Sequence, residues 1–135
     1  MNNNPQKQLY KILSIDGGGV RGVIPAVVLK AIEKKIRKKT GNPDAYLIDY
    51  FDMIGAISLS SIFGLLMIIP EEKKSYRPKY SAHDACDIFL EYLPQIFQTT
   101  LFHNLRTLRG LMDEKYPSNF LEDMLDKYFG HFFRR

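Results

Sequence analysis

Residues 9–22 decide the fold, and they read Leu9-Tyr10-Lys11-Ile12-Leu13-Ser14-Ile15 followed by Asp16-Gly17-Gly18-Gly19-Val20-Arg21-Gly22. The first part is short and apolar with β-branched residues at its end, which predicts a strand. The second part predicts a tight loop, because glycines let the backbone turn sharply. A helical pattern starts directly after Gly22, so the chain begins with a strand, a glycine loop and a helix.

The helix after the loop is predicted over residues 23–39, with Gly41 as its C-cap and Pro43 just beyond. Apolar residues recur at helical spacing along one face, and basic residues fill much of the rest. The basic face fits a solvated surface, the commoner case, or a patch that lies against a membrane. The apolar positions are Ile24, Val27, Val28, Ala31, Ile32 and Ile36, and the basic ones are Lys30, Lys34, Lys35, Arg37, Lys38 and Lys39.

A second strand is predicted over residues 46–56, and a helix that joins two strands implies a parallel sheet. The 17 residues from Met53 to Ile69 carry no charge, which reaches the lower limit for a membrane-spanning helix. Glycine and serine interrupt this stretch, however, and Pro70 ends it. A buried strand followed by a short buried helix over Leu59–Ile69 is therefore the better interpretation.

The second half of the chain is predicted to be helical. One helix begins near Ser81, where Ser81 and Asp84 resemble a capping box, and Pro94 is predicted to end or kink it. Residues 99–116 are less regular. A last helix is predicted from Ser118, with Gly130 as its cap.

Length and composition indicate one small soluble domain. The chain has 135 residues, of which 45% are hydrophobic, and its net charge is +4. So mild a charge permits contact with anionic membrane, and no nucleic-acid partner is expected. The single cysteine, Cys86, excludes an internal disulfide and is expected to be a buried thiol. Residues 1–8 form a polar segment without the apolar core of a signal peptide, which favours a cytoplasmic or peripheral membrane location and leaves non-classical export open.

The loop Gly17-x-Gly19-x-x-Gly22 suits an anion, because free N–H groups at the following helix start carry partial positive charge. A dinucleotide site would need an acidic residue at the end of the second strand, but Asp44, Asp49 and Asp52 precede or begin that strand. The other use is an oxyanion hole, which needs a nucleophile nearby. Ser58 follows the second strand at the turn into the next helix, which is the position of a nucleophile elbow.

Two motifs together resemble the patatin-like phospholipase family: Asp-Gly-Gly-Gly-x-Arg-Gly after a strand, and Phe51-Asp52-Met53-Ile54 leading to an elbow serine. The resemblance covers roughly residues 10–130. It implies an α/β fold, specifically the first part of a three-layer α/β/α domain with a parallel sheet core, over residues 9–135. It also implies hydrolysis of lipid esters of the phospholipase A type, with phospholipids as the leading substrate and without metal or cofactor. In this sequence, it implies that Ser58 is the nucleophile, that the N–H groups of Gly18 and Gly19 form the oxyanion hole, and that Arg21 meets substrate phosphate.

The sequence departs from the family pattern in two places. The family elbow reads Gly-Thr-Ser-Thr-Gly-Gly, whereas Ala56, Ser60 and Ser61 replace its glycines here. The family's catalytic aspartate lies in a later Asp-Gly-Gly or Asp-Gly-Ala motif, but the only Asp-Gly pair here is Asp16-Gly17. A serine hydroxyl without a base is a weak nucleophile. The sequence therefore predicts an impaired or inactive hydrolase, with a non-catalytic lipid-binding protein or degenerate remnant as the alternative and a dinucleotide-binding module as the third.

Overall fold

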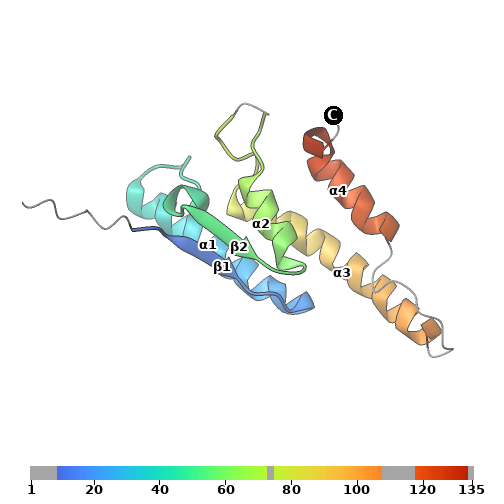
Figure 1. Ribbon diagram of the computed structural model, residues 1–135. Helices are drawn as coiled ribbons and strands as arrows, with labels where there is room; N and C mark the ends of the chain where they lie inside the picture. The colour runs from blue at the N-terminus through green and yellow to red at the C-terminus, as the bar shows by residue number, and fades with distance from the viewer. Residues whose placement is uncertain (1–8, 73–74, 108–117, 134–135) are drawn as a thin grey trace, which may run out of the picture.

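The computed structural model describes residues 9–72, 75–107 and 118–133, and within them the fold is α/β (Figure 1). Strands β1 and β2 are adjacent and parallel, with Ile12 opposite Met53 and Ile15 opposite Ala56. The predicted strand–helix–strand unit and its parallel sheet are thus confirmed. The elements are β1 (Ile12–Ile15), the 3₁₀ turn η1 (Gly19–Gly22), α1 (Val23–Thr40), the 3₁₀ turn η2 (Leu47–Tyr50), β2 (Met53–Ala56), α2 (Ser60–Ile68), α3 (Ala82–Thr107) and α4 (Ser118–Phe133).

The sheet is packed on one face only. Side chains alternate along a strand, so Ile15 and its partner Ala56 share the face that meets the helices, and Ile15 is only 2% exposed. On the opposite face, Ile12 and Met53 are each 55% exposed. Complete parallel sheets are covered on both faces. The described residues therefore form two of the three layers that the resemblance implies.

Helices α1, α2 and α3 build the core on the packed face. Helix α2 is buried as predicted, and its Phe63 is fully enclosed against Phe89 of α3, with ring centroids 6.1 Å apart. The predicted second strand is shorter than residues 46–56, because its first half forms η2 and only Met53–Ala56 pairs with β1.

Helix α1 packs through a different face from the one that its apolar spacing marks. Ala26, Leu29 and Glu33 are its buried residues, whereas Ile24 and Val28 are exposed. The reason is that α1 lies against α3, which the sequence spacing could not place. A four-residue period identifies a face of a helix but does not say which neighbour covers it.

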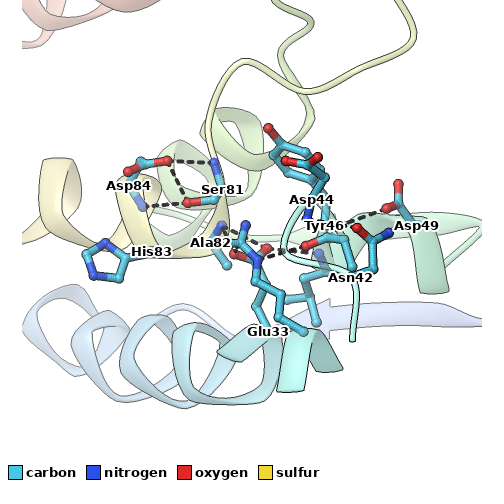
Figure 2. A network of polar contacts seen from close by, with 12 residues as sticks. Glu33, Asn42, Asp44, Tyr46, Asp49, Ser81, Ala82, His83 and Asp84 are labelled. Atoms are coloured by element: carbon cyan, nitrogen blue, oxygen red, sulfur yellow. Dashed lines mark hydrogen bonds and ion pairs between the residues drawn. The ribbon is translucent and has the colours of Figure 1, made fainter. Parts of the chain in front are cut away.

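Glu33 is the one buried charged side chain among the described residues (Figure 2). Its carboxylate accepts hydrogen bonds from the N–H groups of Leu47, at 2.9 Å, and Ala82, at 3.1 Å. Arg37, one turn later, lies 3.0 Å from the same carboxylate. Glu33 thus connects α1, by buried hydrogen bonds, to the start of η2 and to the first turn of α3.

Two predicted helix ends are confirmed. Ser81 and Asp84 form a capping box at α3: the Ser81 hydroxyl accepts from the Asp84 N–H at 3.1 Å, and the Asp84 carboxylate accepts from the Ser81 N–H at 3.1 Å. Gly41 follows α1 in the left-handed conformation, with φ of 68°. Such caps satisfy backbone groups that a helix end leaves unpaired.

At two other predicted helix ends the helix continues. Helix α3 runs through the exposed Pro94 to Thr107, so Pro94 does not end it, and the predicted alternative of a kink stays a prediction. Helix α4 likewise continues through Gly130 to Phe133. Residues 99–107, predicted to be irregular, therefore belong to α3, and residues 108–117 lie outside the described part of the chain. Within the described ranges, no helix is both long and apolar enough to cross a bilayer.

Candidate active site

Ser58 occupies the link between β2 and α2, and its backbone is unusual. Its φ is 61°, and it is the only non-glycine residue with positive φ among the described residues. Left-handed conformations are costly for residues with a Cβ atom and cluster at functional sites. A turn that holds its serine in this way is the feature that distinguishes a nucleophile elbow from an ordinary strand–helix junction.

The glycine loop lies directly against this turn. A Cβ atom added to Gly17 would lie 2.9 Å from the Ile57 carbonyl oxygen and 3.2 Å from the Ser58 Cβ. Contacts that short require glycine at this position. The structure thus brings the loop and the elbow serine together, although they are 41 residues apart in the chain (58 − 17 = 41).

Ser60 connects the turn that holds Ser58 to the glycine loop by a hydrogen bond. It is 1% exposed, and its hydroxyl donates a 2.9 Å hydrogen bond to the Asp16 carbonyl, at the start of the loop. The same oxygen would lie 3.0 Å from a Cβ at Gly22, so the two residues fit closely. Sequence reasoning took Ser60 only as a missing glycine and overlooked this bond. The available signal was a small hydroxyl residue at the first turn of a helix, where side chains commonly bond to nearby backbone.

Ala56 has a compensating partner. A Cβ added to Gly64 in α2 would lie 3.3 Å from the Ala56 Cβ. The missing side chain of Gly64 therefore leaves space for the methyl group of Ala56. Strand β2 can therefore pack closely on α2 although Ala56 stands where the family pattern has glycine.

The glycine loop presents backbone N–H groups at Gly18 and Gly19. Gly18 and Gly19 both have positive φ, 152° and 61°. Their N–H groups donate to no other backbone group within the part of the chain that the structure describes. Arg21 is exposed and runs beside Gly18, with its Cβ 3.3 Å from where a Gly18 Cβ would lie, and Val20 between them is exposed too.

The structure describes no base bonded to Ser58. Among the described residues, no hydrogen bond joins it to a carboxylate or an imidazole. The three acids considered for a dinucleotide site have other partners. Asp52 accepts from the Lys11 N–H at 2.7 Å, Asp44 pairs with Arg77 at 3.2 Å, and Asp49 accepts from the Tyr46 N–H at 2.9 Å. The described ranges also hold no group of three side chains that could bind a metal ion.

A strand, a glycine loop and a left-handed serine at the next strand end define a serine-hydrolase type of α/β junction. Comparison with protein families makes this specific, since the patatin-like phospholipase family matches residues 13–135. The chain belongs to this family.

Curated relatives agree. The chain is 35% identical to Patatin-like protein 2 of Oryza sativa over 132 residues, which is 95% of this chain and 32% of that protein. It is 35% identical to Patatin-like protein 4 of Arabidopsis thaliana, over 96% of this chain and 32% of that protein. It is 32% identical to Probable inactive patatin-3-Kuras 1 of Solanum tuberosum, over 91% and 30%. The chain thus spans about a third of the length of these relatives. No solved structure matches it.

Proposed function

We propose that this chain carries the nucleophile and the oxyanion loop of a lipid acyl hydrolase of the phospholipase A type. Membership of the patatin-like phospholipase family supports hydrolysis of lipid esters as the family-level activity. The observation that carries the assignment of residues is the left-handed backbone of Ser58 beside Gly17. Strain of about 1–3 kcal/mol at such a residue needs a reason, and presentation of a nucleophile is one.

In this proposal, the Ser58 hydroxyl attacks the acyl carbonyl of a phospholipid, the lipid ester C–O bond breaks, and the lysophospholipid leaves with the serine proton. Water then cleaves the acyl-enzyme, which releases the fatty acid and restores the Ser58 hydroxyl. The N–H groups of Gly18 and Gly19, which have no backbone acceptor among the described residues, stabilise the tetrahedral oxyanion. Exposed Arg21 at the rim of the loop binds the phosphate of the substrate. Without a base, acylation loses about 100- to 10,000-fold, so the proposed activity of this chain is low.

Labelling with a fluorophosphonate tests the proposal, because the reagent forms a stable covalent bond with an activated serine. We expect slow labelling of the chain, none of Ser58→Ala, and unchanged labelling of Ser14→Ala, a matched control for an exposed serine on β1. Release of fatty acid from phosphatidylcholine vesicles measures turnover. Equal labelling of the chain and of Ser58→Ala would refute Ser58 as the nucleophile.

A second candidate is lipid binding without catalysis. It is favoured by the lack of a hydrogen-bonded base at Ser58 among the described residues and by the similarity to a relative whose name calls it a probable inactive patatin. It predicts binding to phospholipid vesicles that Ser58→Ala leaves unchanged, together with no labelling above that control. Peripheral contact with a membrane belongs to both candidates.

A further inference from the structure

We propose that the outward face of α1 docks on an anionic phospholipid surface. This face points away from α3, and every one of its residues is exposed, while α1 packs through Ala26, Leu29 and Glu33. The inference rests on the proposed function, because it states where a lipid-directed protein meets its substrate layer. The outward face consists of Ile24, Val27, Val28, Ala31, Ile32, Lys34, Lys35, Lys38 and Lys39.

Apolar and basic residues are separated along this face. The first half of α1 presents apolar side chains, of which Ile24 is 65% and Val28 is 49% exposed. The second half presents only lysines. Because a helix rises about 1.5 Å per residue, the apolar residues 24–32 extend for roughly 12 Å and the lysines 34–39 for roughly 8 Å. A lipid surface offers acyl chains beside charged head groups, and helices that lie in this interface combine an apolar patch with lysines in the same way.

The charge of the outward face is not compensated. Glu33 is the only acidic residue in α1, and it is buried and already bound to Arg37 at 3.0 Å. Lys34 forms no ion pair with any residue that the structure describes. Each lysine near an anionic leaflet contributes attraction, so the lysine half favours such a surface over a neutral one.

A pocket beside the face suits a head-group phosphate. It has a volume of about 500 Å³ and lies between α1 and the first turn of α3. Val27 and Ala31 give it an apolar wall, Lys30, Lys34, Arg37 and His83 supply its basic groups, and Glu33 also lines it. Asp87 bonds Lys30 at 2.7 Å and His83 at 3.1 Å, and Glu33 bonds Arg37 at 3.0 Å. An anion in this pocket would therefore meet Lys34, which pairs with no acid that the structure describes, beside three basic groups that already have an acidic partner.

A second copy of the chain fits the face poorly. Parallel pairing of two α1 helices would put lysines against lysines, and antiparallel pairing would put lysines against Ile24 and Val28. The first arrangement is repulsive, and the second removes charges from water without a partner. A lipid surface avoids both costs.

Vesicle co-sedimentation of the Ser58→Ala chain tests the proposal, since binding is then measured without hydrolysis. We expect binding to vesicles of phosphatidylcholine with phosphatidylserine, weaker binding to phosphatidylcholine alone, and a loss with added salt. Lys35→Gln with Lys39→Gln should lower the partition coefficient on the anionic vesicles roughly 30-fold, which is about fivefold per lysine. The matched control, Lys11→Gln with Lys79→Gln, makes the same change of charge elsewhere on the surface and should lower it by less than about threefold.

The apolar half is tested by Ile24→Ser with Val28→Ser, which should lower binding on the order of tenfold on both kinds of vesicle. The control is Leu9→Ser with Tyr76→Ser, because these side chains are 82% and 104% exposed and lie outside α1. Thermal unfolding of each variant shows that the fold is intact, which is expected at exposed positions.

Equal losses in the test and control variants would overturn the proposal. So would a change from dimer to monomer in Ile24→Ser with Val28→Ser without a change in vesicle binding, because the face would then join two copies. Failure of fluorophosphonate labelling, with face-dependent vesicle binding intact, would refute only the proposed nucleophile. Labelling without face-dependent binding would refute only the docking surface.

Discussion

Replacing Glu33 is the sharpest test of how this core is held together. Its carboxylate serves three donors at once: the Leu47 N–H at 2.9 Å, the Ala82 N–H at 3.1 Å and the Arg37 guanidinium at 3.0 Å. Glu33 is 2% exposed, so water cannot replace these bonds. Figure 2 shows Ala82, at the start of α3, beside Glu33 of α1.

The expected cost follows from the groups left behind. In Glu33→Ala, the Leu47 and Ala82 N–H groups lose their acceptor, and each buried orphan costs about 1–3 kcal/mol. Arg37 also loses its partner, although its side chain is 32% exposed and is partly rehydrated. Breaking a buried pair from one side typically costs about 3–5 kcal/mol, and we expect that loss in the free energy of unfolding. Small domains have only about 5–15 kcal/mol in total.

The comparison with Glu33→Gln separates shape from charge. Glutamine keeps the volume and one acceptor oxygen. Its NH₂ group, however, would face one of the donors that bonds the carboxylate in the native chain, and two donors cannot bond each other. We expect a loss of about 1.5–3 kcal/mol, the range for hydrogen bonds to charged groups. Lys34→Ala, at the exposed neighbouring position, should stay within about 0.5 kcal/mol.

Urea unfolding followed by circular dichroism measures these losses as shifts of the midpoint at an unchanged slope. A loss below about 1 kcal/mol in Glu33→Ala would refute the claim that the Glu33 carboxylate satisfies buried N–H donors. A loss in Glu33→Gln as large as in Glu33→Ala would assign the whole effect to charge.

The other predictions concern the candidate site and the buried thiol. Ser58→Gly should raise the free energy of unfolding by about 1 kcal/mol over Ser58→Ala in urea titrations, because glycine adopts φ of 61° without strain; no difference would refute the strained elbow. Gly17→Ala should lower it by about 1–3 kcal/mol, since the new Cβ would lie 2.9 Å from a carbonyl oxygen; a neutral result would show that the loop is not pressed against the elbow. Ser60→Ala should speed hydrogen exchange of the Arg21 amide, which donates to the Gly18 carbonyl at 3.2 Å, by removing the 2.9 Å bond to the Asp16 carbonyl, whereas an unchanged rate would mean that the bond does not restrain the loop. Burial raises the pKa of the Cys86 thiol, so Ellman's reagent at neutral pH should react on the order of 100-fold more slowly with the native chain than with the urea-unfolded chain; equal rates would place the thiol at the surface.

The sequence could place the candidate residues where the pattern is local. Gly17, Gly18 and Gly19 stand out because a glycine loop between a strand and a helix has few uses, and Ser58 stands out because it follows the next strand; their roles in catalysis stay predictions. Ser60 was misread as a defect, since a hydrogen bond between residues 16 and 60 depends on how two distant turns meet. The Glu33 network was overlooked for the same reason: its partners, Leu47 and Ala82, donate backbone groups that no side-chain pattern reveals.

The sequence by itself determined the family and the order of elements, because the glycine loop, the apolar strands and the capping residues act within a few positions of one another. It could not decide which face of α1 packs. The apolar spacing predicts that Ile24 and Val28 are buried, whereas Ala26 and Leu29 are the residues buried in the structure. Nor could it place the end of α3 at Thr107, since the helix continues through Pro94 against the local preference. Only the tertiary structure decided these points, because burial is a property of neighbours that lie far away in the chain.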